Sequence, residues 1–351
     1  MPQFQNFTAE DKIIESTIVT KGFFQGDLGT LPCTSLATSS IVASQQAYYA
    51  NLAYSSVDHF SVTFGHYAGT GSTSTINGYG ETKAIYQQMA DYLLLPEEVQ
   101  ETGFKFDGTN KAEHVYFLVA NRARMKDRMN RKNWTLELSG SSLTKGTGVS
   151  LSLTDDSADV AAAASVVGPR YNIVKGASGV VTTPASTTCY GWFYPDMGIW
   201  ALDGAALSGS IPGTKLRATN HSSQSYGPAG AENGFHLDSG SAAKNHMQLV
   251  QAMTTGSGNH LMRNEESLLT TAYFVRAKSN HWNCSNNPTY TTSSGRDNTY
   301  RIKEMTGNPR TFISTIGLYN AQNKCVAVGR LSTAVEKAYD SEAYIKIKVN
   351  Y

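Results

Sequence analysis

The chain has 351 residues, a formal net charge of +1 and only 16% charged residues. A near-neutral chain gives no electrostatic basis for binding nucleic acid or an anionic membrane, and no apolar run reaches the roughly 20 residues of a membrane-spanning helix. Nineteen tyrosines and thirty-one glycines among so few charges are typical of a β-rich protein, and the length suffices for one large or two ordinary domains.

The pattern of short apolar runs between turn formers predicts a mainly β, β-rich α+β fold with antiparallel, sandwich-like sheets, one or two short helices and long polar loops. We expect an N-terminal arm at 1–47 and a central β-rich domain at 48–265. Within that domain we expect a helix near 82–95 and a polar excursion over 204–260. A C-terminal antiparallel β module follows at 266–351.

The first residues lack the basic region and the apolar core of a signal peptide, which predicts synthesis and assembly in a cytoplasm. The four cysteines are far apart and form no Cys-x-x-Cys pair, so we expect buried free thiols rather than disulfides or a zinc site. They are Cys33, Cys189, Cys284 and Cys325.

The arm contains one predicted strand between Lys12 and Phe24, followed by a Ser/Thr-rich run with few apolar residues. An isolated segment of this kind buries too little surface to offset its ordering entropy, so arms often order on a neighbouring subunit. In that case Phe23 and Phe24 are contact residues. The alternative is a surface strand of the arm's own domain.

The next segment has a strand at His59–Phe64, a Gly/Ser/Thr loop, and a helix that starts at Thr82. Ile85, Met89, Tyr92 and Leu93 follow the three- and four-residue spacing of a buried helix face. A loop before a helix can bind phosphate, but Lys83 does not stand in a Gly-x-x-x-x-Gly-Lys-Ser/Thr motif. We therefore expect no nucleotide site.

Glu113–Asn121 is predicted to be a buried strand, and it leads into the only dense charge cluster of the chain, Arg122–Arg131. Such a cluster can contact phosphates, but the near-neutral total charge favours a solvated turn or ion pairs with a partner subunit. The candidate interaction residues here are Arg122, Arg124, Arg128 and Arg131.

Two further clusters allow more than one interpretation. Asp155, Asp156 and Asp159 do not have the spacing of a calcium loop and are more typical of a polar hairpin tip. Beyond them, Trp192, Tyr194 and Trp200 flank a Pro-Asp-Met-Gly turn. The three aromatic residues favour a core hairpin, with an exposed glycan-binding platform as the alternative.

No arrangement of residues indicates catalysis. The chain has no Gly-x-Ser-x-Gly, no His-Glu-x-x-His and no close His/Cys/Asp group with ligand spacing, and its eight histidines are scattered. We therefore expect no enzyme activity, no cofactor, no metal and no small-molecule substrate.

The C-terminal residues give the clearest strand pattern. Thr311–Tyr319 and Lys324–Leu331 are rich in β-branched and aromatic residues and flank an Asn/Gln/Asn turn. The final strand alternates strictly, with Tyr344, Lys346 and Lys348 on one face and the isoleucines between them on the other.

These C-terminal motifs carry a resemblance to a known family. They are Asn-Pro-Arg-Thr-Phe-Ile-Ser-Thr-Ile-Gly-Leu-Tyr-Asn from Asn308, Val-Ala-Val-Gly-Arg-Leu-Ser from Val326 and Ala-Tyr-Ile-Lys-Ile-Lys-Val from Ala343. Together with Phe-Tyr-Pro-Asp-Met-Gly-Ile from Phe193 and Val-Ala-Asn-Arg-Ala-Arg-Met-Lys from Val119, they resemble virion structural proteins of large contractile-tailed, T4-like bacteriophages. The resemblance runs in consistent order over most of 59–351.

The resemblance implies a non-catalytic building block of the phage tail or baseplate, assembled in the host cytoplasm and located in the virion. The expected partners are copies of the chain and other phage structural proteins, with the final strand at Tyr351 as one more contact. The alternatives are a carbohydrate-binding or receptor-binding tail protein and a neck or collar component.

Overall fold

A computed structural model shows a mainly β protein with antiparallel sheets, as the sequence predicts. The structure describes residues 5–24, 29–38, 48–72, 80–101, 103–141, 148–207, 210–211, 224–226, 235–237, 245–254, 256–285, 287–292 and 300–350.

The first strands and helices are β1 (Lys12–Gly22), β2 (Thr30–Pro32), β3 (Ala37–Thr38), β4 (Tyr49–Tyr54), β5 (Val57–His66), α1 (Glu81–Leu93), α2 (Pro96–Glu101), β6 (His114–Ala120), α3 (Arg122–Met125), β7 (Arg128–Met129), β8 (Leu136–Ser141) and β9 (Gly148–Asp155). They are followed by β10 (Ala163–Ser165), β11 (Gly168–Ala177), β12 (Val180–Thr183), β13 (Gly191–Tyr194), β14 (Ile199–Asp203), β15 (Gln224–Tyr226), β16 (Phe235–Leu237), α4 (His246–Thr254), β17 (Asn259–Leu261), β18 (Arg263–Ala277), β19 (Thr311–Tyr319), β20 (Cys325–Lys337) and β21 (Ala343–Asn350).

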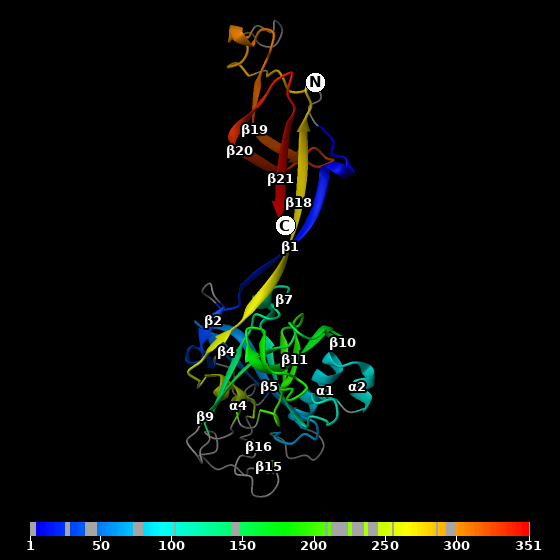
Figure 1. Cartoon of the computed structure of the whole chain (residues 1–351), viewed down its shortest axis with the longest axis vertical. Coiled ribbons are helices and arrows are strands. Elements are labelled where there is room, and N and C mark those ends of the chain that lie inside the picture. The colour runs from blue at the N-terminus through cyan, green and yellow to red at the C-terminus, as the bar shows by residue number, and fades with distance from the viewer. Residues whose placement is uncertain are drawn as a thin grey trace. The chain divides into compact units, whose positions relative to one another are not determined.

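The chain divides into two units. Unit 1 consists of Met1–Ile18 and Ser267–Tyr351, and unit 2 of Val19–Glu266. The segment expected to be an arm, 1–47, is therefore shared between them. β1 and β18 each continue from one unit into the other, and Figure 1 shows β1 (blue), β18 (yellow) and β21 (red) side by side in one sheet, in the order β1-β18-β21.

Unit 2 is built on a large antiparallel sheet whose strands follow the order β3-β4-β5-β6-β14-β13-β11-β9-β8. Its central strands are buried on both faces: in β6, Tyr116 and Leu118 belong to one apolar cluster, whereas Val115 and Phe117 belong to another. A strand covered on both sides needs no polar residues within it. This explains the unbroken apolar run that predicts a buried strand here.

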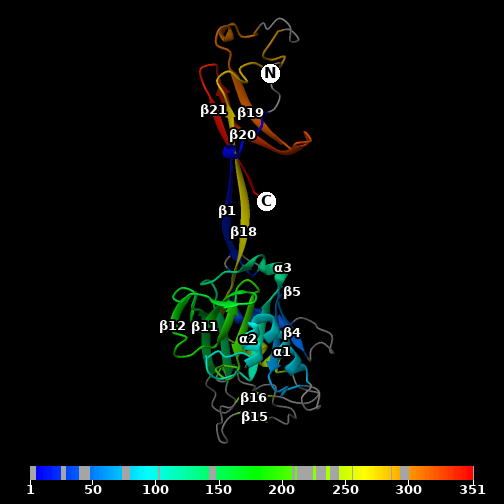
Figure 2. The same cartoon turned by 90° about the vertical axis from the view of Figure 1, so that its right-hand side faces the viewer.

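Helices cover the two faces. α4 contributes Leu249 and Met253 to the first cluster, and α1 contributes Tyr86 and Leu93 to the second, where α1 and α2 lie together (Figure 2). The prediction placed Tyr92 on the buried face of α1, which is wrong, because Tyr92 is exposed.

The buried face of α1 is centred on Tyr86 instead of Tyr92. The Tyr86 hydroxyl donates to the Ala112 carbonyl at 2.9 Å and accepts from the Phe104 backbone amide at 3.1 Å. These bonds satisfy its polar end inside the core, as a buried tyrosine requires.

The four cysteines differ in their exposure to solvent. Cys33 and Cys189 are buried, as expected. The expectation is wrong for Cys325 in β20, which is exposed, and Cys284 is partly exposed.

No helix within the described ranges is long and apolar enough to cross a membrane.

Burial of a histidine makes unit 2 sensitive to acid. His260 is fully buried, and its Nδ1 accepts from the Glu137 backbone amide at 3.3 Å, so Nε2 carries the proton toward the Met253 carbonyl at 3.0 Å. Burial lowers the pKa of His260 to about 4. The unfolded chain, with the ordinary pKa of 6.5, therefore takes up a proton first as the pH falls.

We predict that the free energy of unfolding decreases as the pH falls from 6.5 to about 4 and that His260→Gln reduces this decrease by on the order of 2 kcal/mol. Urea unfolding of both proteins at the two ends of this range measures the difference. His281→Gln, at a partly exposed position, is the control. An unchanged pH dependence in His260→Gln contradicts the prediction.

Candidate interaction surface

Unit 1 contains two separate β layers. β18 and β21 pair antiparallel from Thr270 opposite Asn350 to Ala277 opposite Ala343, while β19 and β20 form a two-stranded hairpin. The predicted alternation of the final strand is confirmed, because Ile345 is buried and Tyr344, Lys346 and Lys348 are exposed. β19 has the predicted bounds.

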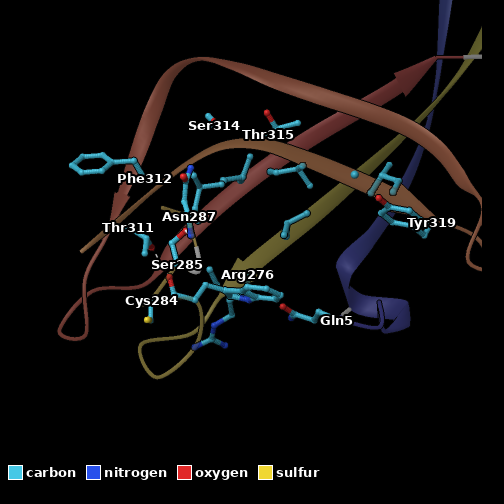
Figure 3. Close-up of a pocket in the computed structure, with 18 of the residues that line it drawn as sticks. Gln5, Arg276, Cys284, Ser285, Asn287, Thr311, Phe312, Ser314, Thr315 and Tyr319 are labelled. Atoms are coloured by element: carbon cyan, nitrogen blue, oxygen red, sulfur yellow. Dashed lines mark hydrogen bonds between the residues drawn. The ribbon is translucent and has the colours of Figure 1, made fainter. Parts of the chain in front are cut away.

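A groove separates these two layers. Its volume is about 830 Å³, and it is lined by Val275 and Ile345 from the β18–β21 sheet and by residues 311–319 of the hairpin. Figure 3 shows the hairpin on one side of the groove, with Asn287 and Ser285 on the other, and the Phe312 ring directed away from it. The two layers thus leave between them space that close-packed protein interiors normally fill.

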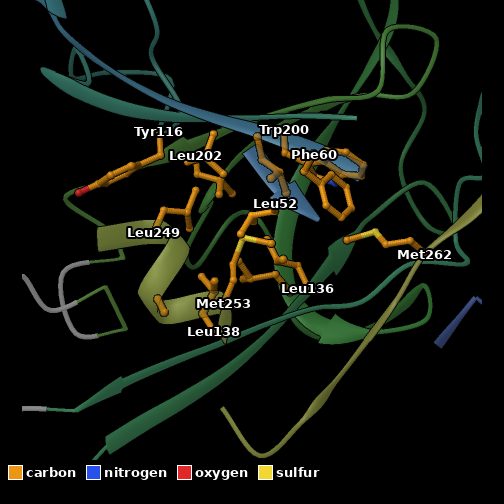
Figure 4. Close-up of a cluster of buried hydrophobic side chains, with 14 of the residues drawn as sticks. Leu52, Phe60, Tyr116, Leu136, Leu138, Trp200, Leu202, Leu249, Met253 and Met262 are labelled. Carbon is orange, nitrogen blue, oxygen red and sulfur yellow. The ribbon is translucent and has the colours of Figure 1, made fainter. Parts of the chain in front are cut away.

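The described residues of unit 1 form no apolar core. Both clusters of buried apolar side chains belong entirely to unit 2, and Figure 4 shows part of the larger one around Trp200 and Leu202. Among the described residues of unit 1, only six apolar residues are buried, and four of them are alanines. The two larger ones are Leu318 and Ile345. An isolated hairpin is marginally stable at best, so unit 1 derives little stability from its own packing.

The apolar side chains of unit 1 face outward instead. Of the eighteen large apolar side chains that are exposed in the described chain, twelve belong to unit 1, although it comprises less than a third of the residues. They are Phe7, Ile13, Ile14, Ile18, Leu269, Ile302, Phe312, Tyr319, Val326, Val328, Tyr339 and Tyr344. These residues lie on more than one face, since the consecutive Ile13 and Ile14 point to opposite sides of β1, and we call this set the outer apolar surface.

Two ion pairs lie on unit 1. Arg276 forms a 2.8 Å ion pair with Glu342, which raises the pKa of Arg276, and Arg310 forms a 2.7 Å ion pair with Glu336. Both pairs are exposed and add little stability.

One buried cation supports unit 1 from within. Lys337 is fully buried, and its Nζ donates to three oxygens, the carbonyls of Ser279 and Ala338 at 3.1 and 2.6 Å and Oδ1 of Asn283 at 2.7 Å. An ammonium group has three donors, and here all three are used. The contact joins the end of β20 to the turn that follows β18.

The expected contact residues Phe23 and Phe24 lie elsewhere. Both are buried in unit 2, with exposures of 2% and 3%, where their rings contact His59 and Phe60. The prediction that they contact a neighbour is wrong, because the aromatic pairs that cover them come from β5 of the same chain. Contacts between residues this far apart in the sequence cannot be recognised from the local sequence pattern.

The basic segment is mostly engaged within unit 2. Arg128 pairs with Glu265, Arg131 donates to the Tyr171 hydroxyl, and Arg122 donates to the backbone carbonyls of Asp127 and Asp196. Arg124 is partly exposed. Their predicted contacts with a partner subunit stay a prediction, and so does the contact at Tyr351, which lies outside the described residues.

The aromatic platform for a glycan is not present. Trp192, Tyr194 and Trp200 are 8%, 1% and 0% exposed; the first two belong to one apolar cluster of unit 2 and Trp200 belongs to the other. The Arg170 guanidinium lies 4.1 Å from the centre of the Trp192 ring and pairs with Glu98. Burial raises the pKa of Tyr194. That alternative is therefore wrong for these three residues.

The acidic cluster is also structural. Asp155 and Asp156 are buried, not at an exposed tip, and they accept from the backbone amides of Lys132 and Asn172 at 3.0 Å each. Burial raises the pKa of both carboxyl groups. Within the part of the chain that the structure describes, no group of three or more His, Cys, Asp or Glu residues has the arrangement of a metal site.

Sequence reasoning missed the outer apolar surface, because none of its residues is among the predicted contact residues. Its signal was present in the alternation of β19, β20 and β21, which indicates a covered face without identifying what covers it. Comparisons with protein-family models, with curated proteins and with solved structures found no match.

We predict that Lys337→Met destabilises unit 1 by about 1–3 kcal/mol, because three oxygens that now accept from Nζ lose their donor. Hydrogen–deuterium exchange measures this as faster exchange at residues 279–283 and along β21. Lys348→Met, which removes the same charge from an exposed position of β21, is the matched control. Equal exchange in the two variants contradicts the prediction.

Proposed function

We propose that the chain is a structural component of a tailed-bacteriophage virion, in the tail or baseplate, and that it acts through contacts between subunits and without catalysis. The observation behind this proposal is that the two units differ in how many of their apolar side chains are buried. Unit 2 has two apolar cores, whereas unit 1 has none in its described residues and exposes most of the chain's outward apolar side chains.

This imbalance fits a subunit that completes its packing in an assembly. Folding requires buried apolar area to outweigh conformational entropy, and unit 1 buries little within its own chain. The outer apolar surface leaves twelve large apolar side chains exposed, which partners in an assembly can cover. A partner that covers it supplies the missing core.

The resemblance of the C-terminal strands to phage virion proteins supports the same proposal from the sequence. Its motifs from Asn308, Val326 and Ala343 form β19, β20 and β21, the strands of unit 1 that carry much of the outer apolar surface. The segment with the recognisable sequence is thus the segment that needs a partner.

The test is incorporation into virus particles. Particles purified by density gradient from infected cells should contain the wild-type chain at a fixed ratio to the other virion proteins. Val328→Asp should lower that ratio roughly tenfold when the variant is supplied to a virus that lacks the wild-type chain, because a carboxylate would be buried in the interface.

Val180→Asp in β12 of unit 2 is the matched control, since Val180 is 71% exposed and Val328 is 64% exposed. It should be incorporated like the wild type. Complete particles that contain no trace of the wild-type chain would refute the proposed function.

A further inference from the structure

β1 has an open edge, and its first seven residues are exposed on both faces. It is the outermost strand of the order β1-β18-β21, so no described strand pairs with its other side. Every residue from Lys12 to Ile18 is exposed, and Ile13, Ile14 and Ile18 are 44%, 57% and 54% exposed. The strand runs alongside β18 in Figures 1 and 2.

Such an edge is a template for another strand. Proteins normally protect a long edge strand with a proline, a bulge, a run of lysines or a covering loop. β1 has the sequence Lys-Ile-Ile-Glu-Ser-Thr-Ile-Val-Thr-Lys-Gly, with no proline and with four β-branched aliphatic residues, Ile13, Ile14, Ile18 and Val19. Its composition thus favours strand addition.

We propose that β1 pairs antiparallel with β1 of a second copy of this chain, about a two-fold axis at Ile18. Residues 14–22 of the two copies then form one continuous ladder, and their sheets join through β1. The inference deepens the proposed function by naming a partner and its surface, and it rests on that function for its place in an assembly.

Charge selects this register. When two copies of β1 pair antiparallel about a two-fold axis, the residue numbers of every directly opposite pair add up to the same value, which identifies the register. The charged residues of β1 are Lys12, Glu15 and Lys21. A sum of 36 places Glu15 opposite Lys21 of the partner, twice. A sum of 30 places Glu15 opposite itself, which juxtaposes like charges.

A sum of 27, which would place Glu15 opposite Lys12, is odd and therefore excluded. A two-fold axis perpendicular to the sheet keeps the same residue of both copies on one face, and directly opposite residues also share a face, so only even sums are possible. The register through Ile18 is therefore the one that combines length with charge complementarity.

The remaining pairs of this register also match. Ile18 lies opposite Ile18, Thr17 opposite Val19 and Ser16 opposite Thr20, which are apolar, β-branched or hydroxyl pairs of the kind that stabilise sheets. Lys21 already lies 3.1 Å from Glu266 of its own chain. The partner's Glu15 adds a second carboxylate to this lysine.

A second copy fits this edge better than an unrelated protein does. The strand is complementary to itself in charge and in the Ile18 contact, and a two-fold contact is the commonest symmetry of protein assemblies. Two-fold pairing also occupies the open edge of β1 in both copies, so no third chain can add to this surface.

The first test uses disulfide cross-linking of the purified full-length chain. Cys284 and Cys325 are changed to Ser, because both are accessible, whereas Cys33 and Cys189 are buried. Ile18→Cys should then form a disulfide-linked dimer under mild oxidation, since directly opposed residues of antiparallel strands lie within the range of a disulfide.

Matched cysteines check the register. Ser16→Cys alone and Thr20→Cys alone should not cross-link, because each lies four residues from its own counterpart. A mixture of the two variants should cross-link, because Ser16 of one copy lies opposite Thr20 of the other. No dimer with Ile18→Cys, or none with the mixture, overturns the proposal.

The second test uses charge. Glu15→Lys places two lysines opposite each other at both ends of the ladder and should weaken dimerisation roughly tenfold. Glu10→Lys makes the same charge change at an exposed residue outside the ladder and should have no effect. Sedimentation over a concentration series up to about 300 µM measures both, since small interfaces have micromolar dissociation constants.

The outcomes separate this inference from the proposed function. A chain that is monomeric throughout the series, or equal weakening by both lysine variants, overturns the β1 pairing even if the chain is found in particles. A cross-linked dimer that is absent from complete particles leaves the pairing intact and refutes the virion function.

Discussion

The uneven distribution of apolar burial governs this structure. In unit 2, each central strand sends alternate side chains into two different cores, so both faces of the sheet are covered by the same chain. In unit 1, the two layers are separated by a groove of about 830 Å³, and several large side chains of the hairpin strands, such as Phe312, Val326 and Val328, are exposed. Because burial of apolar area is the main favourable contribution to folding, the described residues of unit 1 gain less from it than unit 2 does.

The polar interactions of unit 1 are consistent with this arrangement. Lys337 uses all of its donors on neutral oxygens of the same unit, and Arg276 and Arg310 pair with Glu342 and Glu336. Such contacts fix the course of the backbone but contribute little net stability.

Local pattern predicted those elements whose burial depends on neighbours close in sequence. The alternation of residues 343–350 gave the correct strand and faces, and the unbroken apolar run in β6 gave a strand buried on both sides. The positions of Phe23 and Phe24 could not be predicted, because the residues that cover them, His59 and Phe60, are more than thirty positions away. The face of α1 was misjudged because the hydrogen bonds that bury Tyr86 come from residues beyond the helix.

Local sequence pattern also could not identify the outer apolar surface, because its strands show the same alternation of apolar and polar residues as strands with a buried face. A hydrophobic period of two indicates that one face of a strand is covered, but the covering atoms can belong to the same chain or to another. Trp192 and Trp200 are covered by their own chain, whereas Ile13, Ile14 and Val328 are not. Apolar residues that their own chain covers and apolar residues that stay exposed have side chains of the same chemistry. What separates them is whether another part of the described chain packs on the same face. Leu136 and Leu138 lie on β8, an outermost strand of its sheet, and are fully buried within unit 2, whereas Ile13, Ile14 and Val328 are exposed.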